Sequence, residues 1–128
     1  MKTTTAQFNF IQEFINGVDK KIYTSDFADK RDYMQDIDVN TFVDYYLIYE
    51  LTGNTELEWP KSCYMYKDKG GKLKAGPVWD FDKALGYAQK KKYGGDPKRD
   101  YVSQIQEYMG TEKDCTWYME LMKIPEFQ

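Results

Sequence analysis

Hydrophobic residues near the start of the chain recur at the spacing of an α-helix. Steps of three and four residues place side chains on one helix face, and they separate Phe8, Ile11, Ile15, Val18 and Ile22. Thr4 and Gln7 have the spacing of a capping box, in which each side chain bonds the backbone N–H of the other residue. The pattern predicts a helix over residues 5–22 whose apolar face packs in the core.

A second helix is predicted to follow Asp38. Aspartate is a favourable N-cap, and Gly53 is a favourable end because glycine adopts the left-handed backbone without a steric penalty. The apolar residues between these two positions predict the buried face, and they are Val39, Phe42, Val43, Tyr46 and Tyr49.

The middle of the chain has the pattern of a β-hairpin. Residues 62–66 and 73–79 alternate as two strands, and Asp-Lys-Gly-Gly at 68–71 supplies the turn between them. Pro77 has no N–H to donate to a neighbouring strand, so we expect a sheet edge or a bulge there.

The remaining segments complete a mixed fold. Residues 86–99 predict a long loop, residues 102–109 a third helix, and the stretch between Asp114 and Pro125 a fourth. A chain of 128 residues is one domain by default. We therefore predict an α+β fold in which four or five helices surround one central hairpin.

The composition excludes several classes of function. The chain has no histidine, which removes His-based triads and most zinc hydrolase sites. Its net charge is −3 with both signs mixed, so it lacks the footprint of a nucleic-acid-binding protein. No apolar run reaches membrane length, and the first residues lack the apolar core of a signal peptide. Catalysis would therefore rest on carboxylates, lysines or hydroxyls.

The two cysteines do not indicate a metal centre. Cys63 and Cys115 lie far apart in the sequence, and neither belongs to a CxxC motif, so zinc binding is not expected. Two positions alone do not decide whether the thiols pair in a disulfide.

An acidic pair follows the second predicted strand. In an extended conformation Asp80 and Asp82 share one face, while Trp79 and Phe81 point inward and anchor the strand end. Two close carboxylates repel unless a cation lies between them or one takes a proton, and Mg²⁺ is a suitable hard cation. The other interpretation is a charged turn, with Asp82 capping residues 83–85. The spacing alone leaves both interpretations open.

The loop before the hairpin contains a further candidate acid. Glu56 precedes the hairpin, and Asp80 follows it. In protein kinases a catalytic-loop acid likewise precedes the metal-binding Asp-Phe-Gly. The order is suggestive, although acidic residues are common in loops.

Three segments together resemble the CotH family, the spore-coat-protein-H kinase-like proteins. Its signature is roughly Ser-x-Tyr-x-Tyr-Lys-Asp, a glycine turn, then Gly-Pro-x-Trp-Asp-Phe-Asp, and residues 62–82 resemble it closely. Residues 37–51 resemble the helix that precedes the family's Asn-x-Asp loop, which reads Asn54-Thr55-Glu56 in this chain. Residues 117–127 resemble the family's Trp-Tyr…Leu…Pro-x-Phe ending.

The resemblance implies the C-terminal half of a CotH domain, with a fold like a kinase C-lobe. It implies ATP-dependent phosphoryl transfer with Mg²⁺ or Mn²⁺ to a secreted or coat protein, at the cell or spore surface. By this resemblance Asp80 is the metal-binding acid with Asp82 beside it. Glu56 takes the place of the catalytic aspartate, and Asn54 and Ser62 contact the cofactor.

The chain departs from the family pattern in two respects. Glutamate replaces aspartate at position 56, which lengthens the side chain by a methylene. No Gly-rich loop or strand-borne nucleotide lysine precedes residue 36, so we expect a missing N-terminal lobe and no turnover by this chain alone.

Two alternatives to an active kinase remain open. One is a non-catalytic scaffold or surface domain of the same family. The other is a carbohydrate-binding module, for which exposure of Trp59 and Trp79 would be evidence.

Overall fold

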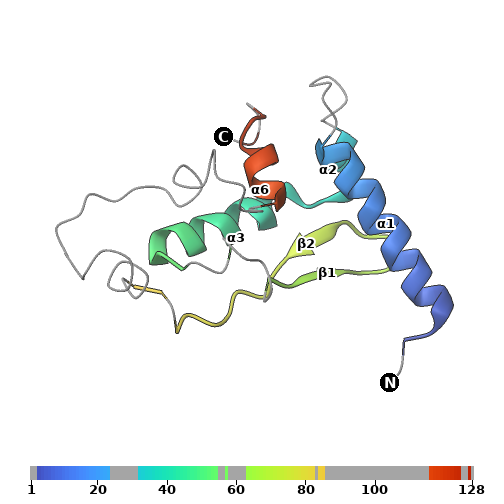
Figure 1. The fold of residues 1–128 in the computed structure, drawn as a ribbon, viewed down its shortest axis with the longest axis horizontal. Coiled ribbons are helices and arrows are strands. Elements are labelled where there is room, and N and C mark those ends of the chain that lie inside the picture. Colours follow the sequence, from blue (N-terminus) through green and yellow to red (C-terminus); the bar gives the residue numbers. More distant parts are fainter. Residues whose placement is uncertain are drawn as a thin grey trace.

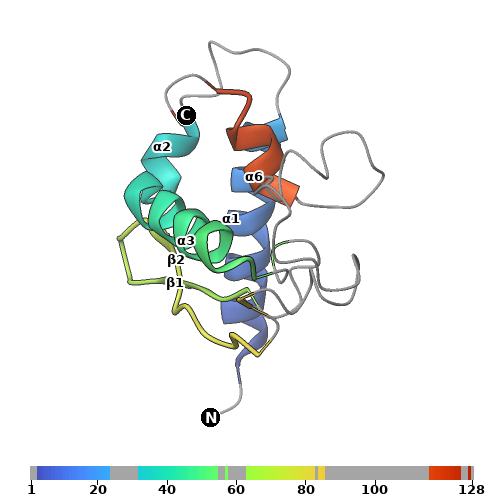
Figure 2. The same cartoon turned by 90° about the vertical axis from the view of Figure 1, so that its left-hand side faces the viewer.

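The computed structural model describes residues 3–23, 32–54, 57, 63–82, 84–85, 116–124 and 127. These ranges contain α1 (Thr5–Tyr23), α2 (Tyr33–Asp36), α3 (Val39–Thr52), β1 (Met65–Lys67), β2 (Leu73–Ala75) and α6 (Thr116–Leu121). The hairpin lies on one side of α3 and α6 on the other, while α1 passes beside them (Figures 1 and 2). The combination of helices with a small antiparallel sheet confirms the predicted α+β class.

The capping box predicted at the start of α1 is confirmed. The backbone N–H of Thr4 donates to Oε1 of Gln7 at 2.9 Å, and the N–H of Gln7 donates back to Oγ1 of Thr4 at 3.3 Å. Both bonds satisfy amides that the first turn of a helix leaves without an intrahelical acceptor. The helix therefore begins where the sequence predicts and ends at Tyr23, one residue beyond the prediction.

Burial of α1 differs from the prediction in its first half. Val18 and Ile22 are buried, but Phe8 and Ile11 are 58% and 54% exposed. The second half of α1 packs against α6 and α2, whereas the first half extends beside the hairpin turn. The apolar stripe is continuous in the sequence, yet only its second half enters the core.

Helix α3 has the predicted ends but a different buried face. Gly53 takes the left-handed conformation at φ 61°, and its N–H donates to the carbonyl of Glu50 at 3.1 Å. Asp38 stands at the N-cap in an extended conformation without a side-chain cap bond. The buried residues of α3 are Phe42, Tyr45, Tyr49 and Glu50, whereas Val39, Val43 and Tyr46 are half-buried against the core.

The hairpin is confirmed with shorter strands than predicted. Its register pairs Met65 with Ala75 and Lys67 with Leu73, and the turn closes through the N–H of Gly71 and the carbonyl of Asp68. Strand β2 ends at Ala75 instead of continuing to residue 79. Beyond it Gly76 has a φ of 127° and Pro77 lacks an N–H, so the ladder cannot continue.

Two hydrogen bonds fix the hairpin to α3. The N–H of Asp38 donates to the carbonyl of Leu73 at 2.8 Å, and the N–H of Ala75 donates to Oγ1 of Thr41 at 3.1 Å. The position of β2 is therefore set by the first turn of α3, which in turn determines where the chain after β2 emerges.

The core is formed by α1, α3, α6 and one face of the hairpin. Phe42 lies 6.3 Å from Trp117 and 6.1 Å from Tyr118 between ring centroids. The indole N–H of Trp117 also donates to Asp19 at 2.8 Å, which ties α6 to α1. Helix α6 is the described part of the predicted fourth helix.

Several predictions fall outside the described residues. The loop at 86–99, the helix at 102–109 and Cys115 belong to them, so pairing of Cys115 with Cys63 stays untested. Over the described ranges, no helix combines the length and apolar character needed to span a bilayer.

Candidate functional site

The chain reaches the acidic pair in a backbone conformation that the sequence did not predict. Asp80 lies in the left-handed region at φ 61°, where only glycine, asparagine and aspartate are common. The strict alternation of an extended strand is therefore broken, and the expectation that residues 80–82 are extended is wrong. The N–H of Ala84 donates to the carbonyl of Phe81 at 3.1 Å, so a turn begins here, as the alternative interpretation proposed.

Two side chains at the end of α3 hold this strained segment. The hydroxyl of Tyr49 donates to the carbonyl of Trp79 at 2.9 Å. The amide of Asn54 donates to the carbonyl of Asp80, also at 2.9 Å. A left-handed residue other than glycine costs about 1–2 kcal/mol and persists where the surroundings fix it. These two bonds to successive carbonyls supply that constraint.

Asn54 is the residue that joins the two halves of the candidate site. Its side chain is fully buried, and its own N–H donates to the carbonyl of Tyr49 at 2.9 Å. It also begins the loop that contains Glu56, so the start of this loop is tied to Asp80. Glu56 and Ser62 themselves lie outside the described residues. The geometry gives Asn54 a positioning role, while its contact with a nucleotide stays a prediction.

A short chain of hydroxyl groups extends this arrangement into the core. The hydroxyl of Tyr45 donates to that of Tyr49 at 3.0 Å, and their rings stack with centroids 4.5 Å apart. Burial, reinforced by the hydrogen bond with Tyr49, raises the pKa of the Tyr45 hydroxyl far above its ordinary value. Tyr45 therefore stays a neutral donor, which leaves the proton of Tyr49 directed to the Trp79 carbonyl.

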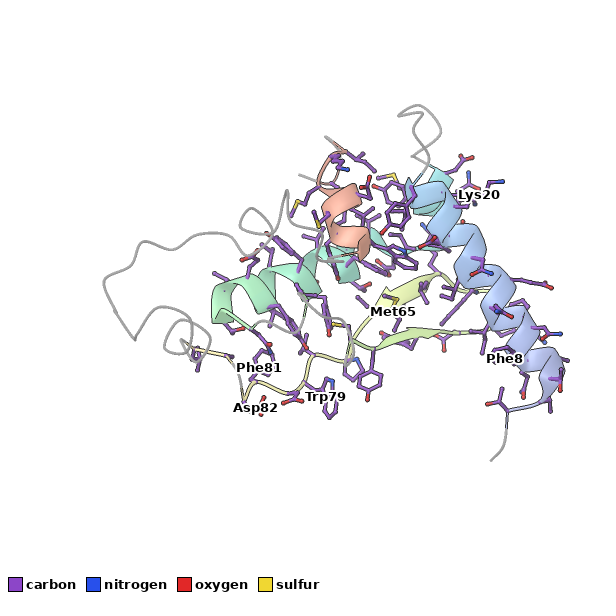
Figure 3. The ribbon with its side chains drawn as sticks, in the orientation of Figure 1. Phe8, Lys20, Met65, Trp79, Phe81 and Asp82 are labelled. Carbon is purple, nitrogen blue, oxygen red and sulfur yellow. The ribbon has the colours of Figure 1, made fainter. Side chains whose placement is uncertain are left out.

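The aromatic residues beside the acids are less buried than predicted. Phe81 is 37% exposed, and its ring centroid lies 5.5 Å from that of Tyr49 under the end of α3 (Figure 3). Trp79 is 43% exposed and lies 5.2 Å from the ring of Tyr64, so the prediction that it points inward is wrong. The left-handed turn at Asp80 explains why Trp79 and Phe81 do not share one inward face.

The donor chemistry of the acidic pair suits a magnesium ion with few protein ligands. Asp80 and Asp82 are both exposed and offer hard carboxylate oxygens. In the part of the chain that the structure describes, no three His, Cys, Asp or Glu side chains gather to enclose a metal. Mg²⁺ often keeps several waters and binds one or two carboxylates together with phosphate oxygens, and these residues fit that mode.

Sequence reasoning missed two residues that shape this end of α3. The sequence pattern assigns Tyr49 to the core face only and does not single out Glu50. Glu50 is 4% exposed, and one of its carboxylate oxygens accepts a hydrogen bond from the hydroxyl of Tyr46 at 2.8 Å. The spacing of four residues between Tyr46 and Glu50 is the signal that could have indicated this pair.

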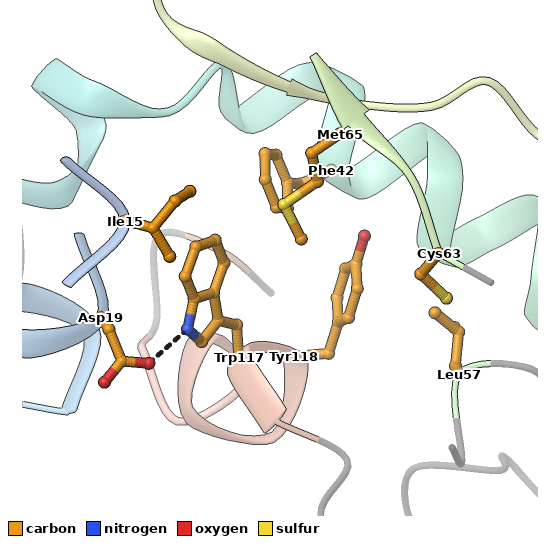
Figure 4. A pocket seen from close by; sticks show the side chains of 8 residues that line it. All are labelled: Ile15, Asp19, Phe42, Leu57, Cys63, Met65, Trp117 and Tyr118. Carbon is orange, nitrogen blue, oxygen red and sulfur yellow. Dashed lines mark hydrogen bonds between the residues drawn. The ribbon is translucent and has the colours of Figure 1, made fainter. Parts of the chain in front are cut away.

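An apolar cavity lies away from the acidic pair. It has a volume of about 290 Å³ between α1, α3, β1 and α6, and Ile15, Phe42, Met65 and Tyr118 form much of its wall (Figure 4). The hydrogen bond between Trp117 and Asp19 crosses one side of it. Neither acid of the pair lines it, so it belongs to the packing of the core and not to the candidate site.

Comparison with known families identifies a family model that matches the chain. The family model described as CotH kinase protein matches residues 2–128, nearly the whole chain, which confirms the resemblance found in the sequence. Comparisons with curated proteins and with solved structures gave no match.

Proposed function

The chain belongs to the CotH kinase family, and we propose that it forms the metal-holding and acceptor-orienting side of an ATP-dependent protein kinase. Family membership suggests the kinase-like function. The order of the elements supports the finer assignment, because α3, an acidic loop, a hairpin and an Asp-Phe-Asp segment follow one another as in a kinase C-lobe.

The observation that carries the proposal is the hydrogen bond from Asn54 to the carbonyl of Asp80. It joins residues 26 positions apart at 2.9 Å. Phosphoryl transfer depends mainly on positioning and on charge stabilisation. A buried amide that ties the start of the loop containing Glu56 to the backbone of Asp80 supports positioning of this kind.

Each site residue has a distinct role in the proposal. Asp80 holds Mg²⁺ or Mn²⁺ with Asp82 beside it, and the bound metal would neutralise charge on the phosphates of ATP. Glu56 orients or deprotonates the acceptor hydroxyl, with a reach one methylene longer than that of aspartate. Asn54 positions Asp80 through its buried amide, and a contact of Asn54 and Ser62 with the nucleotide is the remaining part of the proposal.

The proposal includes a partner lobe and a protein substrate. Residues 1–36 contain neither a Gly-rich loop nor a strand-borne nucleotide lysine, so a second lobe would supply both. The substrate is a secreted or surface protein, and the site of action is the cell or spore surface, as the family resemblance implies.

Metal binding provides the first test. Calorimetry should detect weak Mn²⁺ binding that strengthens when a nucleotide is present, and Asp80→Asn should abolish it. Asp68→Asn is a matched control, because Asp68 is an exposed acid in the hairpin turn. Unchanged Mn²⁺ binding by the Asp80→Asn variant would refute the assignment. If the affinity for Mn²⁺ were the same with and without a nucleotide, the non-catalytic scaffold domain would be favoured.

Phosphate transfer provides the second test. In a protein that includes both lobes, Glu56→Gln removes the charge and keeps the size of the side chain. We expect a loss of about 10²–10⁴-fold in turnover, the usual contribution of a general base. Equal transfer with and without the substitution would exclude Glu56 as the base.

A carbohydrate-binding role is the second candidate, and the exposure of Trp79 beside Tyr64 is the observation in its favour. Exposed aromatic rings can stack on apolar faces of a ligand. Retention on insoluble polysaccharide that is lost in Trp79→Ala would support this function, whereas equal retention of both proteins would exclude Trp79 as its platform. Trp59 lies outside the described residues.

A further inference from the structure

The first half of α1 presents apolar side chains that the core does not cover. Phe8, Phe10 and Ile11 are 58%, 62% and 54% exposed, although they belong to a well-capped helix. Single exposed apolar residues are common on protein surfaces, but a contiguous group often marks an interaction site. Phe10 and Ile11 line one groove, whereas Phe8 does not.

A groove runs between this half of α1 and the hairpin. It has a volume of about 350 Å³, and its apolar wall is formed by Phe10, Ile11, Phe14, Met65, Tyr66 and Leu73. The hairpin turn forms its other side. A groove of this size lies at the small end of ligand sites and accommodates a few anchoring side chains.

The hairpin gives the groove a basic rim. Residues 67–74 contain four lysines and one aspartate, a net charge of +3, whereas the whole chain carries −3. The ammonium of Lys72 donates to the carbonyl of Met34 at 2.6 Å, and that of Lys67 to the carbonyl of Gly71. Within the described residues the ion pairs lie elsewhere, at Lys21–Asp36 and Lys123–Glu120. Lys67 and Lys69 line the groove itself, with Asp68 between them. The ammonium of Lys67 also lies 4.9 Å from the ring centroid of Phe14, and that of Lys74 lies 5.7 Å from the ring centroid of Tyr66. Carbonyls and rings leave the positive charge of the hairpin in place, so it can attract an acidic partner.

The helix that forms the other wall carries no charge along residues 5–12. The groove thus combines an apolar wall with a basic edge. We propose that it docks a segment of a partner protein in which apolar anchor residues are flanked by acidic ones. The apolar anchors would fill the groove, and the acidic flank would face the hairpin lysines.

Charge argues against a second copy of this chain as the occupant. A two-fold dimer places the same patch of both subunits face to face. Two such patches would bring two hairpins of net charge +3 together around the apolar contact, and like charges across an interface are unfavourable. An acidic segment, by contrast, would be attracted to the positive charge of this surface.

Fluorescence anisotropy with a short labelled peptide tests the proposal. The probe carries two leucines flanked on both sides by glutamates, and the comparison peptide replaces the glutamates with lysines. We expect the glutamate peptide to bind and to weaken as salt is added, because exposed charges are screened. Equal binding of the two peptides would overturn the charge assignment, and no binding of either would overturn the site.

Matched variants locate the binding. Phe10→Asp removes an apolar contact, Lys69→Glu reverses a charge on the rim, and each should weaken binding about tenfold or more. Lys20→Glu at the far end of α1 makes the same change of charge at an exposed position (Figure 3). Leu51→Asp makes the same apolar-to-acidic change at an exposed position of α3. Neither residue lines the groove, and both variants should leave binding unchanged. Equal effects of the test and control variants would overturn the location.

Sedimentation of the same proteins tests the competing occupant. We expect the unmodified protein and the Phe10→Asp variant to sediment alike as monomers. A dimer that Phe10→Asp dissociates would assign the groove to a second copy and overturn the proposal.

Discussion

Replacing Asn54 by aspartate changes one atom of a fully buried side chain and reverses its hydrogen-bonding role. The amide nitrogen that donates to the carbonyl of Asp80 becomes a carboxylate oxygen, so two acceptors face each other at the position of a 2.9 Å bond. The shape of the side chain is almost unchanged. Any effect therefore reports the hydrogen bond and the charge, not a cavity.

The loss of stability expected for Asn54→Asp follows from the burial of the Asn54 side chain. Loss of the hydrogen bond removes about 1 kcal/mol, and leaving a buried polar group without its partner adds about 1–3 kcal/mol. A buried carboxyl also has a raised pKa, and keeping it protonated costs about 1.4 kcal/mol for each pH unit above its unfolded pKa, until the folded pKa is reached. A protonated carboxyl can still donate to Asp80, so this cost is an alternative to the loss of the bond and is not added to it; from an unfolded pKa of about 3.9 it reaches about 4 kcal/mol at pH 7. The cheaper alternative sets the loss at neutral pH at about 3 kcal/mol, against a typical domain stability of about 5–15 kcal/mol.

Urea denaturation measures this loss. With a slope of about 2 kcal/mol per molar urea, the midpoint of Asn54→Asp should fall by about 1.5 M at neutral pH. Because the raised pKa belongs to the folded state, the unfolded state loses its proton first as pH rises, and the variant loses stability with it. The midpoint should therefore recover as the pH is lowered, since the protonated carboxyl can donate to Asp80.

The control is Asn16→Asp, the same substitution at an exposed position of α1. It should shift stability by no more than about 0.5 kcal/mol. If Asn54→Asp unfolded at the same urea concentration as Asn16→Asp at neutral and at lowered pH, the hydrogen bond to Asp80 would not stabilise the fold. Mn²⁺ binding by the folded variant then reports whether the position of Asp80 depends on that bond.

Three further predictions concern stability, each measured by urea midpoint. Phe81→Ala should cost only about 1–2 kcal/mol because the ring is 37% exposed. Phe42→Ala, in the core, should cost about 3–5 kcal/mol. Equal losses in the two variants would contradict the partial exposure of Phe81. Thr4→Ala should cost about 1 kcal/mol through loss of the capping box, and no change would contradict that cap. Burial raises the pKa of Tyr45 and of Tyr118, so both stay protonated in the folded state while the unfolded state ionises above about pH 10. The free energy of unfolding should then fall by about 1.4 kcal/mol per pH unit for each tyrosine. If Tyr118→Phe left this pH dependence unchanged, Tyr118 would not contribute to it.

Features set by neighbouring residues could be read from the sequence. The capping box of Thr4 and Gln7 and the helix end at Gly53 both formed as predicted. The glycine turn between the strands did so as well. Each depends on backbone groups within a few positions along the chain, so the residues that determine it lie side by side in the sequence.

Features set by distant residues could not be read in this way. The sequence pattern of α1 does not reveal that Phe8 and Ile11 lie outside the core, because burial depends on which elements pack against each part of the helix. The same holds for α3, where Tyr45 takes a more buried place than Tyr46. The spacing of apolar residues in the sequence predicts which face of a helix is apolar, but the neighbouring elements decide how much of that face is buried.

The candidate site shows the same division. The sequence by itself determined the family signature and the acids at Asp80 and Asp82. Only the tertiary structure decided that Asp80 is left-handed, because the donors that hold it come from Tyr49 on α3 and from Asn54, which follows the end of that helix. A strained backbone is stable only where contacts from elsewhere in the fold fix it, and those contacts exist only once α3 and the hairpin have packed together.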